Sequence, residues 1–157
     1  LHDFEPIMQH RGLECRFEGP SSESVVQMDR YLYERILFNL LSNAVKFTPK
    51  EGRISVLLQL KDQRLILAVS DTGSGIPPEH IEKLFTPFFT TKGHEGSGLG
   101  LLTCHQVVDE HRGLIHVHSE VGRGTTFTVR LPIDPRAYDR RQQGRRLDDD
   151  TPLPAAA

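Results

Sequence analysis

The sequence feature that most constrains the fold is a long helical pattern at residues 31–47. At about 100° per residue, its apolar side chains gather on one broad face and its polar side chains on a narrow arc. The apolar face consists of Tyr33, Ile36, Leu37, Leu40, Leu41 and Ala44. Asp29 stands at the position of an N-cap, and Pro49 and Gly52 end the helix. A helix with so broad an apolar face has to pack against a second layer.

Short β-rich segments predict that this second layer is a sheet. They cover residues 13–17, 53–60, 64–70, 114–119 and 125–131, and the last four read as two hairpins. Residues 1–10 read as the end of a helix, and further helices are expected near residues 78–84 and at residues 99–111. The order of elements predicts an α+β protein, a two-layer α/β sandwich with a mixed, mostly antiparallel sheet under a helical layer.

Composition bounds the class of protein. A chain of 157 residues is long enough for one domain, and its net charge of −2 gives no electrostatic footprint for nucleic acid. No apolar run approaches the length of a membrane span, and two cysteines are too few for a disulfide framework. We expect a cytoplasmic domain at residues 12–133, preceded at residues 1–11 by a helix end or linker and followed at residues 134–157 by a disordered tail. The sequence leaves open whether a longer parent protein is anchored in a membrane.

The polar arc of the long helix is formed by Arg35, Asn39, Ser42, Asn43 and Lys46. A solvated face is the ordinary explanation of such an arc. Asparagine is a poor residue for a helix interior, yet two of them lie one turn apart. Amide oxygens suit Mg²⁺ that is already bound to nucleotide phosphates, and a lysine suits the phosphates themselves. The arc therefore suggests a nucleotide site without establishing one.

A first glycine cluster follows a buried strand at residues 70–76. Asp71 can accept hydrogen bonds from an amino group, and Gly73 and Gly75 let a planar ligand approach the backbone. An exposed aspartate in a plain turn explains the segment equally well. Residues 71–74 also spell Asp-Thr-Gly-Ser, the catalytic tetrapeptide of aspartic proteases, so a protease half-site at Asp71 is a second alternative.

A second cluster at residues 93–101 runs straight into a helix. Backbone N–H groups at such a helix start form a cradle for an anion. The spacing fits neither a P-loop nor a dinucleotide fingerprint. A third cluster at residues 122–127 reads by itself as a β-turn.

Five segments occur in one order: 39–47, 71–75, 85–89, 96–101 and 122–125. This order resembles the N, G1, F, G2 and G3 boxes of the histidine-kinase catalytic domain, within the GHKL superfamily. The resemblance covers about residues 13–132, and residues 88–92 are most similar to the nitrogen-sensor type of kinase. It implies the Bergerat sandwich, which agrees with the α+β prediction.

By this resemblance Asn43 would ligate Mg²⁺ with help from Asn39, and Lys46 would contact the phosphates of ATP. Asp71 would accept from the adenine amino group. The segment 86–97 would form a lid that orders over nucleotide. The resemblance implies that the nucleotide is bound by Asn43, Lys46, Phe47, Asp71, Gly73, Gly75, Ile76, Phe88, Lys92, Gly96, Ser97, Gly98, Leu99, Gly100, Leu101 and Thr125.

Two departures from the family patterns bear on activity. Gyrase-like and chaperone-like relatives carry a general-base glutamate where this chain has Asn39, so we expect little ATP hydrolysis and instead phosphoryl transfer by positioning and charge neutralisation. Residues 2–6 are one residue short of a histidine box, so we expect no self-phosphorylation.

The expected partners are a separate dimerisation domain that carries the acceptor histidine, and a response regulator. No nucleic acid is expected, and the chain by itself should be monomeric. A non-catalytic module that senses nucleotide remains an alternative. His116 and His118 share one strand face, and with His111 and Cys104 they allow a zinc site to be imagined, although a hydrated face explains them more simply.

Overall fold

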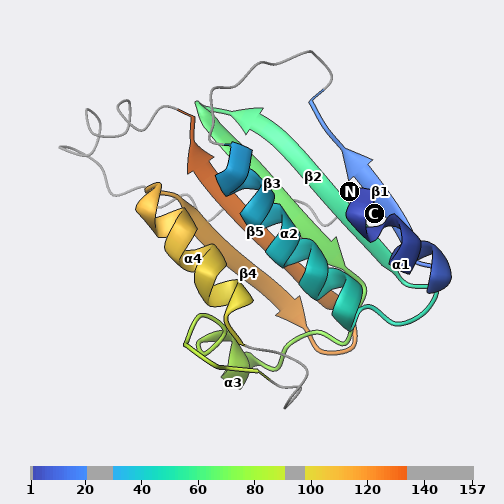
Figure 1. Cartoon of the computed structure of the whole chain (residues 1–157). Coiled ribbons are helices and arrows are strands. Elements are labelled where there is room, and N and C mark those ends of the chain that lie inside the picture. Colours follow the sequence, from blue (N-terminus) through green and yellow to red (C-terminus); the bar gives the residue numbers. More distant parts are fainter. Residues whose placement is uncertain (1, 21–29, 91–97, 134–157) are drawn as a thin grey trace.

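The protein is a two-layer α+β sandwich, described here from a computed structural model that places residues 2–20, 30–90 and 98–133. Its helices are η1 (His2–Phe4), α1 (Glu5–His10), α2 (Arg30–Phe47), α3 (Pro78–Ile81) and α4 (Gly100–Glu110). Its strands are β1 (Glu14–Glu18), β2 (Arg53–Lys61), β3 (Arg64–Asp71), β4 (Leu114–Glu120) and β5 (Gly124–Pro132). Helices α1, α2 and α4 lie on one face of the sheet (Figure 1). The predicted fold class is confirmed.

The sheet has the strand order β1-β2-β3-β5-β4, with β1 parallel to β2 and every other pair antiparallel. Both predicted hairpins form, β2 with β3 and β4 with β5. The central strand β3 ends at Asp71, which lies opposite Ile54 on one side and Thr125 on the other. This register brings the first and third glycine clusters to the same end of the sheet.

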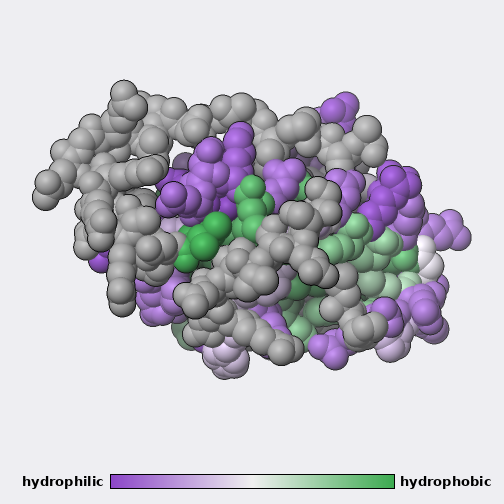
Figure 2. Space-filling model, turned by 90° about the horizontal axis from the view of Figure 1, so that it is seen from above, coloured by the Kyte–Doolittle hydropathy of each residue, from purple (hydrophilic) through white to green (hydrophobic). Residues whose placement is uncertain are grey.

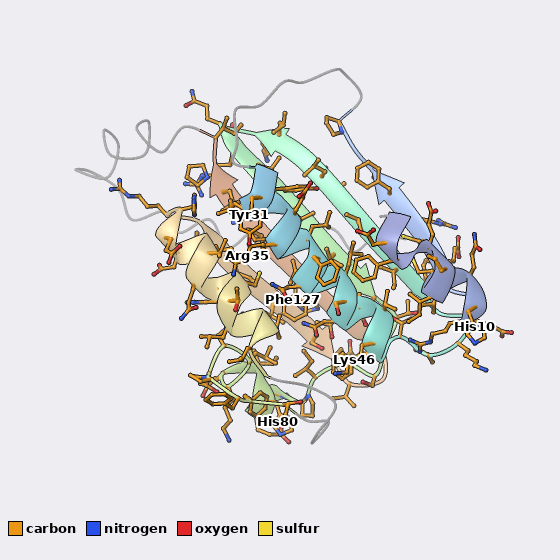
Figure 3. All side chains as sticks on the ribbon, viewed as in Figure 1. His10, Tyr31, Arg35, Lys46, His80 and Phe127 are labelled. Carbon is orange, nitrogen blue, oxygen red and sulfur yellow. The ribbon has the colours of Figure 1, made fainter. Side chains whose placement is uncertain are left out.

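The core lies between α2 and the sheet, as the apolar face of the helix predicts. Ile36 and Leu40 of α2 are fully buried, as are Ile54 of β2 and Val129 of β5. Phe127 of β5 lies beneath α2 (Figure 3). Seen from above, hydrophobic side chains lie toward the middle of the molecule and hydrophilic ones border them (Figure 2). Truncating one of the buried leucines to alanine typically costs about 2–5 kcal/mol.

The observed elements differ from the predicted ones mainly at their ends. Strand β1 begins at Glu14 because Leu13 turns into the core, where it is 8% exposed. Helix α3 stops at Ile81, since residues 82–87 form turns. The predicted N-cap Asp29 and the predicted tail at residues 134–157 lie outside the described residues.

The zinc alternative finds no support in the described ranges. His116 and His118 are exposed side chains on β4. Nowhere in residues 2–20, 30–90 and 98–133 do three or more histidine, cysteine, aspartate or glutamate side chains gather as metal ligands. Over the same residues, no helix is both long and apolar enough to span a membrane.

Candidate functional site

The end of β3 presents Asp71 beside two backbone donors. The carboxylate is half-buried, and its Oδ1 accepts the N–H of Gly73 at 2.8 Å. Burial raises the pKa of Asp71, and hydrogen bonds from the backbone of Gly73 and Thr125 lower it in part. A carboxylate held in this way is placed to accept a hydrogen bond from a ligand amino group.

The glycines that follow Asp71 allow separate segments to pack backbone against backbone. A β-carbon on Gly73 would lie 2.7 Å from the carbonyl oxygen of Phe47, at the end of α2. A β-carbon on Gly75, which has φ +69°, would lie 2.1 Å from the carbonyl oxygen of Glu120. These contacts explain both glycines structurally, and their predicted role of making room for a base stays a prediction.

Ser119 joins the first and third glycine clusters, and sequence reasoning missed it. Its hydroxyl accepts the N–H of Ile76 at 2.8 Å, donates to the carbonyl of Gly124 at 3.0 Å and lies 2.9 Å from the hydroxyl of Thr125. Thr125 is buried at 6% exposure. A serine on an alternating strand gives no sequence signal, because its partners come from segments far away in the chain.

At the other end of the site, Asn39 of α2 meets the start of α4. A β-carbon on Gly100 would lie 3.2 Å from the side-chain oxygen of Asn39. Helix α4 begins after Leu99 with no side-chain cap and no acidic residue in its first turn. The first N–H groups of such a helix have no partner inside the helix, and its N-terminus carries a partial positive charge. The structure thus brings the amide of Asn39 beside a helix start that has no side-chain cap.

Asn43 and Lys46 follow Asn39 at intervals of four and three residues, so the three residues lie along one side of α2. Asn43 and Lys46 are half-buried, and the Lys46 ammonium lies 6.0 Å from the centre of the Phe47 ring. Lys46 sits at the end of α2 on the side of the molecule where α3 lies (Figure 3). Ile76 and Leu101 are partly buried against the core.

Of the predicted lid at residues 86–97, the structure describes only the first part, residues 86–90. Phe88 is 74% exposed, so the structure does not bring its side chain into the site. Gly98 packs against the backbone of Phe88. The predicted contacts Lys92, Gly96 and Ser97 lie outside the described residues.

Comparison with known proteins decides the family. Residues 28–135 match the family described as histidine kinase-, DNA gyrase B- and HSP90-like ATPases. The chain belongs to this family. Sensor histidine kinase ZraS of Salmonella typhimurium is 37% identical over 132 residues, which are 83% of this chain but only 28% of that protein. Sensor protein SrrB of Staphylococcus aureus is 40% identical over 110 residues, 67% of this chain and 18% of that protein.

Solved structures of sensor kinases share the fold. The catalytic domain of histidine kinase ThkA superimposes with a TM-score of 0.77 at 32% identity, covering 86% of this chain and 88% of that one. ThkA in complex with response regulator protein TrrA gives a TM-score of 0.71 at 30% identity, covering 86% of this chain and 38% of that one.

These findings confirm the predicted ATP-binding domain of the sensor-kinase type. The aspartic protease alternative required a mostly β chain, so the α+β sandwich excludes it.

Proposed function

We propose that this domain binds Mg²⁺-ATP and transfers the γ-phosphoryl group to a histidine on a separate phosphoacceptor domain. The observation that carries the proposal is the contact between the Asn39 amide and the start of α4. It places a neutral oxygen donor beside an uncapped helix N-terminus. A metal ion bound to phosphates needs such an oxygen ligand, and the phosphates themselves are bound well by a helix N-terminus.

Each end of the site would hold a different part of the nucleotide. Asp71 would accept from the adenine amino group, with Thr125 beside it. Asn43, helped by Asn39, would hold Mg²⁺, which neutralises the charge of the phosphates. Lys46 and the first N–H groups of α4 would orient the phosphates for transfer.

The chain's own residues favour transfer over hydrolysis. The side chain of Asn39 is an amide and cannot take a proton from water at neutral pH. Phosphoryl transfer needs little general-base chemistry when the acceptor is already a nucleophile such as imidazole. We therefore expect slow hydrolysis by this domain and efficient transfer when an acceptor is supplied.

A groove beside the phosphate end would receive the acceptor. It has a volume of about 660 Å³ and lies between η1, α2 and the start of α4, and both Asn39 and Gly100 line it. Its rim exposes large apolar side chains: Tyr31 at 68%, Phe38 at 53% and Leu99 at 39%. An apolar helical surface that carries a histidine fits such a rim. ThkA, in its complex with TrrA, supports a response regulator as the downstream partner. Because ATP and both proposed partners belong to the cytoplasm, we also propose a cytoplasmic location for this domain.

The first experiment is calorimetric titration with a non-hydrolysable ATP analogue, in Mg²⁺ and in EDTA. We expect saturable, Mg²⁺-dependent binding by the wild type and none by Asp71→Asn. Asp109→Asn, a change of an exposed aspartate on α4, should bind as the wild type does. No binding by the wild type would contradict the proposal.

Transfer is tested next by adding phosphoacceptor domains in trans with radiolabelled ATP. Label on the acceptor and none on this chain is the expected result. Binding without transfer to any of several acceptors would favour the non-catalytic nucleotide-sensing module.

A further inference from the structure

The carboxyl end of α2 lacks one backbone donor. In a continuing helix the carbonyl of Val45 would accept the N–H of residue 49, but that residue is Pro49, which has none. Thr48 does not fill the gap, because its N–H donates to the carbonyl of Ala44 at 3.0 Å and its hydroxyl donates to the same carbonyl at 2.5 Å. The Val45 carbonyl therefore needs a donor from outside the helix.

Arg11 supplies this donor. Its Nη1 donates to the carbonyl of Val45, and its Nη2 donates to the carbonyl of Thr48 at 2.5 Å. A planar guanidinium suits two neighbouring carbonyls, and its charge is favourable at the negative end of a helix. The carbonyl of Arg11 also accepts the N–H of Glu51 at 3.2 Å. One residue thus ties the end of α1 to the end of α2 and to the turn before β2.

The last turn of α2 belongs to the nucleotide site. It carries Lys46 and Phe47. The carbonyl of Phe47 lies against Gly73, whose N–H donates to Asp71. Because backbone touches backbone here, a shift of this turn would move the Asp71 loop as well.

The segment at residues 2–11, which contains Arg11, contacts α2 at two points. The ring of Phe4 lies 5.1 Å from the ring of Phe38, and Arg11 binds the carbonyl of Val45. Phe38 directly precedes Asn39, and Val45 directly precedes Lys46. Helices α1 and α2 run in the same direction across the same face of the sheet (Figure 1).

We propose that Arg11 is a positioning residue for the nucleotide site and couples the affinity for ATP to the placement of residues 2–11. It supplies the donor that Pro49 cannot and so fixes the turn that carries Lys46 and Phe47. The inference rests on the proposed function, because it concerns the same nucleotide site.

The test compares the affinity of Arg11→Met and wild type for the Mg²⁺-bound ATP analogue by calorimetry. Loss of the two guanidinium hydrogen bonds should weaken binding about three- to ten-fold, which lies within the range of couplings carried by such indirect contacts. Arg16→Met is the matched control, because it removes an exposed arginine that pairs with Glu14 at the surface of β1. Its affinity should stay within about two-fold of the wild type.

A second substitution tests whether Arg11→Met acts through the lost hydrogen-bond donor or through the lost packing of the side chain. Pro49→Ala returns a backbone N–H to the position that the Val45 carbonyl would use. The double variant Arg11→Met/Pro49→Ala should therefore regain most of the lost affinity. Amide hydrogen exchange of residues 44–48 should be faster in Arg11→Met than in the wild type and slower again in the double variant.

A further control distinguishes a specific effect on the nucleotide site from a general loss of stability. This control is Leu131→Ala, which truncates a buried side chain of β5. This variant should unfold more easily and still bind the analogue normally at a temperature where it is folded. Equal affinity of Arg11→Met and wild type, absence of rescue, or an equal loss in Leu131→Ala would overturn the inference. A wild type that binds no nucleotide would overturn the proposed function and the inference together.

Discussion

The backbone of Gly98 lies directly against the backbone of Phe88. A β-carbon on Gly98 would come 2.5 Å from the carbonyl carbon of Phe88 and 2.8 Å from the nitrogen of Phe89. Both Gly98 and Phe88 have positive φ, +64° and +62°. Phe88 lies near the start of the segment that the family resemblance identifies as a lid, and Gly98 directly follows the end of that segment. The two residues are therefore held together by a contact that only glycine allows.

Replacing Gly98 by alanine should loosen this contact. We expect Gly98→Ala to lower the free energy of unfolding by more than the ~1–2 kcal/mol that left-handed backbone costs an alanine. Its affinity for the ATP analogue should fall as well. Gly122→Ala is the control, since Gly122 has φ +80° but nothing within 4 Å of its β-carbon position. Equal losses of stability in urea unfolding of the two variants would show that the Phe88 contact contributes nothing.

The half-buried carboxyl of Asp71 should lower the free energy of unfolding at neutral pH. Its folded-state pKa is raised, chiefly by burial, so its ionised form is less favourable in the folded chain than in the unfolded one. This penalty is fully present above the raised pKa. It shrinks as the pH falls through that value, and it is gone below the ordinary value of 3.8.

We therefore expect Asp71→Asn to unfold at a higher urea concentration than the wild type at pH 7, although it loses nucleotide binding. The difference should narrow as unfolding is measured at falling pH. A variant that is less stable than the wild type at pH 7 would mean that the hydrogen bonds of Asp71 outweigh its burial.

The hydroxyl of Ser119 should matter for both stability and binding. Ser119→Ala leaves the N–H of Ile76 and the hydroxyl of Thr125 without this partner, which should cost about 1–3 kcal/mol. It should also weaken binding of the analogue, because Ile76 and Thr125 lie at the predicted adenine end. Ser70→Ala removes a comparable 2.9 Å hydrogen bond with Thr126 on the other face of the sheet. That control should lose stability and keep its affinity.

The two cysteines should differ in reactivity. Burial raises the pKa of Cys104 to about 12, and its side chain is 1% exposed. Cys15 is exposed, and partial burial raises its pKa as well. A maleimide reagent should therefore modify Cys15 in the folded chain and reach Cys104 only in urea. Mass spectrometry of labelled peptides measures this directly, and early labelling of Cys104 would reveal local opening of α4.

The sequence by itself determined the elements and their classes. The 3.6-residue period of residues 31–47 predicts a helix with one buried face, and the structure buries Ile36, Leu40 and Leu41 there. The alternation and turn residues of the two hairpins predict β2 with β3 and β4 with β5. These signals are local, because helical periods and turn chemistry depend on residues close together in the chain.

Only the tertiary structure decided which distant groups meet. No local pattern indicates that Arg11 replaces the donor that Pro49 lacks, that Ser119 joins Ile76 to Thr125, or that Asn39 meets Gly100. The sequence predicted that Gly73 and Gly75 make room for a ligand. The structure gives a second reason for glycine, because a β-carbon at either position would collide with the backbone of Phe47 or Glu120. Such contacts depend on strand register and on the packing of helices across the sheet, which join residues far apart in the sequence and leave no period in it.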